Sequence, residues 1–278
     1  MKSWAVNDIM KRSKRGKGMR KAVVMASAVV MAMAVSADMP QIVAHRGGSK
    51  EQDQNTLAAL QNSCAKGVRG FEIDVRLTKD RRIVLMHDDM IERLTTGQGR
   101  VEDLTSAELA RIRTRKSNQP LPYLEEVFDF LKDKEGAFVQ VEIKSGKYSE
   151  ADLAEMCGLL LGMVKRQIDP AKVIFISFDK RALRKIKELE PKQQTCLVTS
   201  EANPHVIQTA QAVGAGQLSV ELNHLYRAFV RDAHKAGLKV TAWTVGQAED
   251  AQLAIAMGTD YVATDIPAAQ LDQKSARP

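Results

Sequence analysis

Short β-rich runs alternate with helical patterns throughout residues 38–278, and this alternation constrains the fold more than any other feature of the sequence. The expected strands are Gln41–Arg46, Phe71–Leu77, Ile83–His87, Phe138–Lys144, Lys172–Phe178, Thr195–Thr199, Gln217–Leu222, Lys239–Val245 and Tyr261–Thr264. The expected helices are Thr56–Lys66, Thr105–Ile112, Tyr123–Lys132, Glu150–Gln167, Lys180–Leu189, Pro204–Val213, Tyr226–Ala236 and Ala248–Ala256. Strand-then-helix units repeated in this order predict an α/β protein with a single (β/α)8 TIM-barrel domain.

The sequence predicts nine strands, one more than the eight of a (β/α)8 barrel. Ile83–His87 is expected either to continue a barrel strand or to form a hairpin with Phe71–Leu77 through the turn at residues 80–82. A doubly wound open sheet is the alternative fold. The sequence has no G-x-x-x-x-G-K-[ST] motif, and Gly97–Gly99 follows no expected strand, so a nucleotide-binding loop is not predicted.

The net positive charge of the chain is confined to its N-terminal segment. The whole sequence carries +7, from 41 basic and 34 acidic residues. Residues 1–37 contain eight Lys and Arg and one acid, Asp8, which leaves 33 basic and 33 acidic residues in 38–278. A neutral body has no overall field that attracts a polyanion, so nucleic acid is not an expected partner.

The N-terminal segment has the pattern of a secretory signal peptide. The basic stretch ends at Lys21, and the uncharged run Ala22–Ala37 that follows is shorter than the ~20 residues of a membrane-spanning helix. Small residues close the run ahead of Asp38. We therefore expect residues 1–37 to be removed and 38–278 to be exported, periplasmic or secreted, with no stable membrane insertion. An uncleaved N-terminal anchor is the alternative, and Met19 is a second possible start.

The three cysteines are expected to be core residues. Cys64, Cys157 and Cys196 lie far apart in apolar surroundings and form no C-x-x-C pair. An odd number excludes a fully paired disulfide framework. Isolated thiols in apolar sequence are commonly buried.

Two expected strands carry carboxylates on one face. Glu72 and Asp74 alternate with apolar residues in Phe71–Leu77, and Glu142 and Lys144 do so two strands later. The outer face of a barrel packs against helices, so these charges are expected to point inward, where Val, Ile and Leu are usual. Three convergent carboxylates need a compensating cation, and oxygen ligands favour Ca²⁺ or Mg²⁺. Solvent-facing charges or a structural ion-pair cluster are the alternative.

Two histidines end expected strands, at the edge where TIM barrels carry their active sites. His45 and His87 beside a metal would supply the general acid and base that phosphodiester cleavage needs. Arg46 offers a fork for a phosphate oxygen and Lys144 a point charge. No G-x-S-x-G elbow supports acyl-hydrolase chemistry. The remaining histidines are expected to be structural: His205, His224 and His234.

The motifs around these residues resemble those of the glycerophosphodiester phosphodiesterase family. The matching segments are His45–Gly47, Asn55–Ala59, Phe71–Asp80, Val84–Asp88, Val141–Lys144, Ser177–Asp179, Trp243–Val245 and Thr264–Pro267. The resemblance implies a TIM-barrel hydrolase that converts small glycerophosphodiesters, such as glycerophosphocholine or glycerophosphoethanolamine, to glycerol 3-phosphate and an alcohol. The site residues it implies are the metal ligands Glu72, Asp74 and Glu142, the acid–base pair His45 and His87, and the substrate-binding residues Arg46, Lys144 and Trp243.

Two positions depart from the family pattern. Gln54 stands where the family usually has an acid, which predicts a weaker or rearranged cation site. Arg81 stands where a glycine is usual, which affects a turn and not the chemistry. Ordinary core packing is the alternative role for Trp243.

Two other functions are compatible with these residues. One is phospholipase D-like cleavage of lysophospholipids or sphingomyelin on the same fold, and the other is a binding module without catalysis. The sequence leaves open the alcohol, the choice of Ca²⁺ or Mg²⁺, the separate roles of the two histidines and the oligomeric state.

Overall fold

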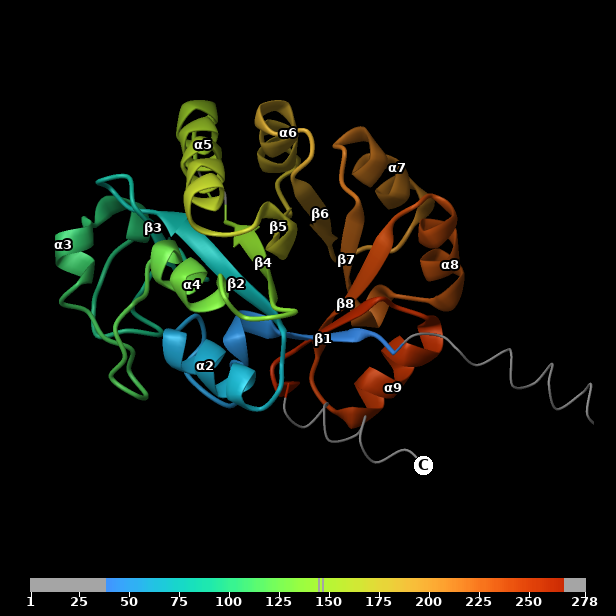
Figure 1. Ribbon diagram of the computed structural model, residues 1–278, viewed down its shortest axis with the longest axis horizontal. Helices are drawn as coiled ribbons and strands as arrows, with labels where there is room; N and C mark the ends of the chain where they lie inside the picture. The colour runs from blue at the N-terminus through green and yellow to red at the C-terminus, as the bar shows by residue number, and fades with distance from the viewer. Residues whose placement is uncertain (1–38, 145, 147, 268–278) are drawn as a thin grey trace, which may run out of the picture. The chain divides into compact units, whose positions relative to one another are not determined.

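In a computed structural model, which describes residues 39–144, 146 and 148–267, the chain forms a closed barrel of parallel strands with helices on its outside (Figure 1). The barrel strands are β1 Gln41–Ala44, β2 Gly70–Leu77, β4 Phe138–Ile143, β5 Val173–Ser177, β6 Gln194–Thr199, β7 Gln217–Glu221, β8 Lys239–Val245 and β9 Tyr261–Thr264. Each strand pairs in parallel with the next, and β9 pairs with β1 to close the ring. The TIM-barrel prediction is confirmed, and closure rules out the open sheet.

The extra strand forms a hairpin. β3 Ile83–Leu85 runs antiparallel to β2, with Leu77 opposite Ile83. Arg81, in the turn between them, has a φ of 64°, in the left-handed region that favours glycine. The turn therefore keeps the conformation that a glycine would give it, even though arginine occupies the position.

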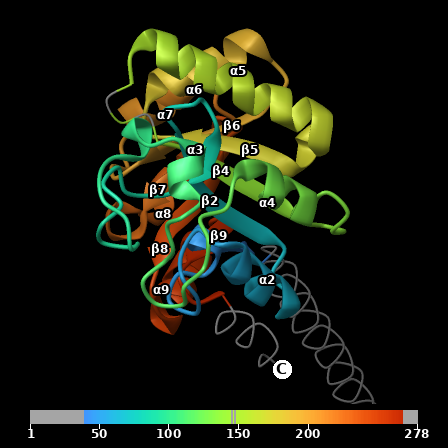
Figure 2. The same ribbon diagram turned by 90° about the vertical axis from the view of Figure 1, so that its left-hand side faces the viewer.

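Helices follow the strands and cover the barrel (Figure 2). They are α2 Leu57–Ala65, α3 Ser106–Leu109, α4 Leu124–Leu131, α5 Glu150–Gln167, α6 Lys180–Leu189, α7 Pro204–Ala212, α8 Arg227–Lys235 and α9 Ala248–Met257. Short 3-10 turns occupy η1 His45–Gly47, η2 Val101–Asp103, η3 Pro170–Lys172 and η4 Leu222–His224. Side-chain caps fix helix starts: Thr56 accepts the Ala59 amide of α2, and Ser149 accepts the Asp152 amide of α5.

Several elements are shorter than the sequence predicts, mostly by one or two residues at an end, and two of the differences have a clear cause. The first strand ends at Ala44 and not at Arg46, because Arg46 has a φ of 51° and turns the chain out of the sheet. The helix expected over Thr105–Ile112 ends at Leu109. The chain beyond it pairs with an earlier loop, where the Thr96 amide donates to the Arg113 carbonyl at 2.8 Å.

The alternating faces of the strands separate the core from the barrel interior. Phe71, Ile73 and Val75 of β2 are fully buried in the apolar layer beneath the helices, whereas the carboxylates between them point into the barrel. All three cysteines are free thiols. Cys157 and Cys196 are buried as predicted, whereas Cys64 is half-buried and packs against the edge of the core.

No helix in residues 39–144, 146 or 148–267 has the length and apolarity needed to cross a bilayer. The expected signal peptide, residues 1–37, lies outside the described residues.

Candidate active site

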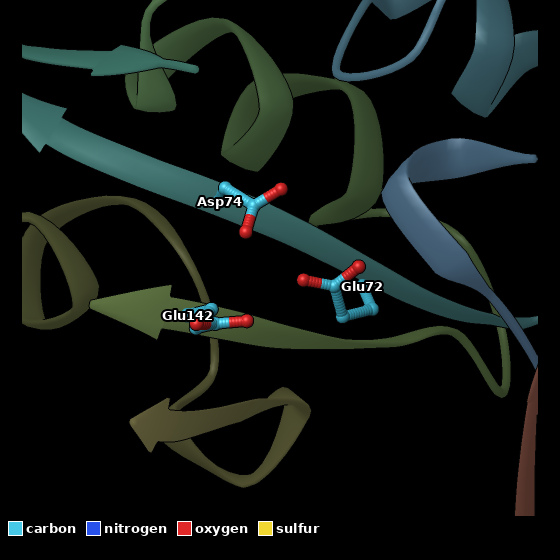
Figure 3. A group of neighbouring side chains, drawn as sticks. All are labelled: Glu72, Asp74 and Glu142. Carbon is cyan, nitrogen blue, oxygen red and sulfur yellow. The ribbon is translucent and has the colours of Figure 1, made fainter. Parts of the chain in front are cut away.

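Three carboxylates converge inside the barrel. Glu72 and Asp74 lie on β2, and Glu142 lies on the neighbouring β4, where the parallel register places it directly beside Asp74. Each residue offers an oxygen that is within 4.8 Å of the others, and all three side chains point into one space (Figure 3). They are almost completely withdrawn from solvent. The predicted cluster is therefore present, and it lies inside the barrel and not on a solvent-facing edge.

The cluster is electrostatically unbalanced toward negative charge. Burial, and next the charge of Asp74, raises the pKa of Glu72 to about 8, and the same two causes raise the pKa of Glu142. Buried oxygens Glu72 Oε1 and Asp74 Oδ1 accept no hydrogen bond from any described residue. Unsatisfied carboxylate oxygens facing one another fit a hard divalent cation, which would replace the missing partners.

Asp74 is held ionised by its neighbours. Its Oδ2 accepts a hydrogen bond from Asn55 Nδ2 at 2.8 Å, and its own amide donates to Asn55 Oδ1 at 3.0 Å. Burial alone would raise its pKa, but the charges of Lys144, His87 and Arg46 and the Asn55 bond more than offset burial and lower it. Asn55 is thus a site residue whose role the sequence analysis missed, although the Asn-Thr motif was part of the resemblance.

Two cations lie against the carboxylates. Lys144 Nζ is 2.8 Å from Glu142 Oε1 and 3.4 Å from Asp74 Oδ1. Arg46 donates its backbone amide to Glu72 Oε2 at 2.7 Å, and its Nε lies 3.7 Å from Asp74 Oδ2. The left-handed turn at Arg46 is what aims this amide at the cluster.

The turn that carries Arg46 packs tightly against α2. Gly47 has a φ of 82°, and a Cβ there would lie 2.9 Å from the Ala59 Cβ. Gln54 Oε1, in the next loop, accepts a hydrogen bond from Arg46 Nη1 at 2.8 Å. Gln54 therefore positions the guanidinium as a neutral partner, although the family pattern usually has an acid there.

His45 presents its Nε2 to the cluster. Its Nδ1 lies 2.6 Å from Asp265 Oδ1, and because a carboxylate can only accept, Nδ1 carries the shared hydrogen. Nε2 is 3.9 Å from Glu72 Oε2. Burial would lower the pKa of His45, but the hydrogen bond to Asp265 and the charge of Glu72 more than offset it, so the pKa is raised. Ser49 Oγ donates to the same Asp265 oxygen.

His87 is held in the same way from the other side. Its Nδ1 lies 2.7 Å from Asp88 Oδ1, and Arg93 Nε donates to Asp88 Oδ2 at 2.7 Å. The His87 carbonyl accepts from Arg76 Nη2 at 2.8 Å. Burial, more than any other cause, lowers the pKa of His87, and Lys144 adds to the effect. The pKa shifts of the two histidines are opposite because the carboxylates around His45 more than offset its burial, whereas those around His87 do not.

These side chains share one cavity of about 180 Å³. Seven of the eight predicted site residues line it: His45, Arg46, Glu72, His87, Glu142, Lys144 and Trp243. The eighth, Asp74, is bonded to the charged groups beside it and is 1% exposed. The structure therefore brings all eight together, and the histidines predicted to be structural do not line this cavity.

The far wall of the cavity is uncharged. Its residues are Ile176, Phe178, Val198, Ser219, Trp243 and Ala263. Phe178 meets Trp243 edge to face, with ring centroids 5.8 Å apart. The indole Nε1 of Trp243 is buried and has no hydrogen-bond partner among the described residues. A buried donor of this kind is available to a ligand hydroxyl.

Some residues of the site were not predicted. Asp265 and Asp88 hold the two histidines, and both stand inside motifs that the sequence analysis quoted without giving them a role. Gln140 lines the cavity, and its amide is buried without a partner among the described residues. It lies two residues before Glu142 on the same polar strand face, so the alternation could have identified it.

The sequence of the chain matches a known protein family over most of its length. The sequence model of the Glycerophosphoryl diester phosphodiesterase family matches residues 45–269. The chain belongs to this family. A glycerophosphodiester phosphodiesterase from Caldanaerobacter subterraneus is 32% identical over 232 residues, which cover 81% of this chain and 94% of the relative.

Solved structures of glycerophosphodiester phosphodiesterases and related proteins share the fold. An Oleispira antarctica phosphodiesterase in complex with the product sn-glycerol-3-phosphate has a TM-score of 0.79 at 26% identity, over 86% of this chain and 98% of that one. A glycerophosphodiester phosphodiesterase from Parabacteroides distasonis has a TM-score of 0.76 at 25% identity, over 86% and 99% of the two chains. The family assignment made from the motifs is confirmed.

Proposed function

We propose that the protein hydrolyses small glycerophosphodiesters, such as glycerophosphocholine or glycerophosphoethanolamine, to glycerol 3-phosphate and an alcohol. Family membership supports a phosphodiester substrate. The observation that carries the proposal is the gathering of two carboxylate-held histidines, three carboxylates and two cations around one small cavity. A cavity of about 180 Å³ suits a small polar molecule more than a lipid with its acyl chain.

A divalent cation fits the acidic cluster. Glu72, Asp74 and Glu142 would hold it, because their oxygens converge within 4.8 Å and two of these buried carboxylates have an oxygen that accepts no hydrogen bond from any described residue. When bound, such an ion withdraws charge from a phosphodiester oxygen. Ca²⁺ and Mg²⁺ match the all-oxygen donor set, and an exported protein would meet abundant Ca²⁺.

Arg46 and Lys144 bind the phosphate in this proposal. Both line the cavity and both lie within 4 Å of the acidic cluster, so a phosphate placed beside the cluster meets two cations. The planar guanidinium of Arg46 can donate to two phosphate oxygens, and Lys144 provides a point charge. Their positive charges stabilise the negative charge that develops in the transition state.

His45 and His87 each transfer a proton through the Nε2 atom, one with the nucleophile and the other with the leaving group. The Nδ1 atoms are committed to Asp265 and Asp88, so each ring has a fixed orientation and one free nitrogen. One histidine takes the proton from the nucleophile, either water or the glycerol 2-hydroxyl through a transient cyclic phosphate. The other histidine donates a proton to the leaving alkoxide.

Trp243 lines the part of the cavity that admits glycerol. The apolar side chains around it would contact the carbon skeleton, and its unpartnered Nε1 would donate to a hydroxyl. This arrangement separates the site into a charged side for phosphate and a neutral side for the polyol.

The test is release of glycerol 3-phosphate from glycerophosphocholine by purified residues 38–278. We expect turnover with Ca²⁺ or Mg²⁺ and at least a 100-fold loss after exhaustive chelation, restored by adding the ion back. Lysophosphatidylcholine as a parallel substrate should be cleaved far more slowly. Turnover that survives chelation would remove the metal from the proposal, and tight glycerophosphocholine binding without product would replace the enzyme by a binding module.

We also propose that the protein acts outside the cytoplasm after removal of residues 1–37. The basic and apolar pattern of that segment supports export. N-terminal sequencing of the protein recovered from the extracytoplasmic fraction should begin at Asp38. Recovery of the intact N-terminus in the cytoplasm would contradict this.

A further inference from the structure

A second, separate cleft lies beside the reaction cavity and carries an excess of cations. Its volume is about 290 Å³. Three cationic side chains line it, Arg93, Arg115 and Lys116, against a single carboxylate, Asp53. Because residues 38–278 as a whole have equal numbers of basic and acidic residues, this local excess is not a consequence of overall charge.

Two of these cations, Arg115 and Lys116, have donor nitrogens without a partner among the described residues. Asp53 accepts from the amide and hydroxyl of Ser117, which lower its pKa against the opposing effect of burial, together with the more distant charge of Lys116. Arg115 uses its Nε on the Glu92 carbonyl at 2.8 Å, and its two terminal nitrogens have no partner among the described residues. The Nζ of Lys116 also makes no hydrogen bond or ion pair with any described residue. The cleft thus presents donors that lack an acceptor.

The cleft shares its walls with the residues that hold the reaction groups. Gln54 lines it and accepts the hydrogen bond from Arg46 at 2.8 Å. Arg93 lines it and holds Asp88, which holds His87, through two contacts of 2.7 Å. A ligand in the cleft would therefore contact one residue that bonds to Arg46 directly and another that reaches His87 through Asp88.

The opposite wall makes a third connection of the same kind. Ser49 lines the cleft, and its hydroxyl donates to the Asp265 oxygen that holds His45. Arg46 is thus reached from the cleft through one wall residue, Gln54, and each histidine is reached through a wall residue and the carboxylate that it holds. The cleft is separate from the reaction cavity but is connected to it by these hydrogen bonds.

The residue at position 54 increases the excess of positive charge in this cleft without determining its sign. An acid is usual before the Asn-Thr pair in the family pattern, whereas this chain has Gln54. An acid there would place a second carboxylate on the wall and would pair with Arg46. The glutamine keeps the hydrogen bond to Arg46 but leaves the cleft with net positive charge.

We propose that this cleft binds a second anionic group of the substrate, namely a phosphate carried by the alcohol part of the glycerophosphodiester. The proposal rests on the proposed function, because it assigns the substrate class of that same site. A phosphomonoester would accept from the free nitrogens of Arg115 and from Lys116 while the phosphodiester lies at Arg46. Arg115 and Lys116 are specificity residues in this account, and they take no part in bond breaking.

The experiment compares glycerophosphoinositol with glycerophosphoinositol 4-phosphate, which differ by one phosphate, with glycerophosphocholine as the reference substrate. We expect kcat/KM about tenfold higher for the 4-phosphate at low ionic strength, and a smaller ratio as salt is added. The double variant Arg115→Gln, Lys116→Gln should reduce the ratio to about 1 while glycerophosphoinositol turnover stays within twofold. Lys192→Gln, which removes an exposed lysine outside this cleft, is the matched control and should keep the wild-type ratio.

The outcomes separate the two proposals. If glycerophosphocholine and both inositol compounds are inert, the proposed function fails and this inference falls with it. If glycerophosphocholine is hydrolysed but the 4-phosphate has no advantage, or if the double variant keeps the advantage, the cleft does not bind the second phosphate and only this inference is overturned. Lys116→Glu supplies an independent check, since it should favour glycerophosphoinositol over the 4-phosphate.

Discussion

The two sides of the reaction cavity differ sharply in charge, although both are built from the same strand-and-helix unit. The charged arc comes from β1 to β4 and the turns that follow them, and consists of His45, Arg46, Glu72, Asp74, His87, Gln140, Glu142 and Lys144. The neutral arc comes from β5 to β9, and consists of Ile176, Phe178, Val198, Ser219, Trp243 and Ala263. Asp265, directly after β9, bonds to His45 of the charged arc.

Under the proposed function, this difference separates the reacting groups from those that recognise the polyol. Charged groups that share an arc can compensate one another, as Lys144 does for Glu142 at 2.8 Å, and they shift one another's pKa. Spread around the ring, the same groups would each bear the cost of burial alone. The neutral arc places apolar side chains opposite the charges and leaves Trp243 Nε1 as a donor.

The largest expected effect comes from removing a histidine of the charged arc. His45→Ala and His87→Ala should each lower kcat on glycerophosphocholine by about 10²–10⁴-fold, because each removes a proton-transfer group. Stopped assays of glycerol 3-phosphate release measure this, with circular dichroism to confirm folding. Lys192→Gln, which changes an exposed lysine outside the cavity, is the control and should stay within about twofold. Full activity in both histidine variants would contradict the acid–base assignment.

The next effect comes from the carboxylates that orient the histidines. Asp265→Asn and Asp88→Asn should lower kcat by about 10–100-fold, with little change in KM, because each loosens a ring whose Nε2 must face the substrate. The hydrogen bond to Asp265 raises the pKa of His45, so Asp265→Asn should move the corresponding limb of the pH–rate profile to lower pH. A loss of activity with an unmoved profile would indicate a purely structural role.

On the neutral arc the expected effect is smaller and of a different kind. Trp243→Phe keeps an aromatic ring but removes the unpartnered Nε1 donor. We expect KM for glycerophosphocholine to rise about 3–10-fold with kcat nearly unchanged, since one hydrogen bond contributes about 0.5–1.5 kcal/mol. A fall in kcat comparable to that of His45→Ala would break the division between the two arcs.

The charged arc also predicts pH-dependent stability for the metal-free protein. The pKa of Glu72 is about 8 in the fold against 4.5 ordinarily, so between these values the folded state keeps a proton that the unfolded chain has released. The free energy of unfolding should therefore fall as the pH rises from 5 to 8. Each kcal/mol lost would lower Tm by about 2–4 °C. Glu72→Gln should flatten this dependence. If the stability of wild type and variant falls equally with pH, Glu72 is not the cause of the pH dependence.

Much of the fold and of this asymmetry was predictable from sequence. Glu72, Asp74 and Glu142 alternate with apolar residues, and this pattern showed which side chains enter the barrel. The other face of each strand packs against helices and cannot hold a carboxylate. The helix starts were equally clear at Ser149, where a local cap decides the boundary.

What could not be predicted depends on contacts between distant residues. Asp265 bonds to His45 across 220 positions, and the residues next to Asp265 in the sequence do not indicate this contact. The left-handed turn at Arg46 cut the first strand short because its amide bonds to Glu72, a tertiary contact that overrides strand propensity. The cleft around Arg115 likewise exists only once two loops are folded together.

The central claim is that Glu72, Asp74 and Glu142 together bind one divalent cation. Isothermal titration of Ca²⁺, and separately of Mg²⁺, into protein freed of metal by chelation tests it directly. The account predicts one site per chain in the wild type for at least one of the two ions, and a loss of affinity of roughly 100-fold or more in Glu72→Gln and in Glu142→Gln. No binding of either ion to the wild type, or the same affinity in both variants, would contradict it.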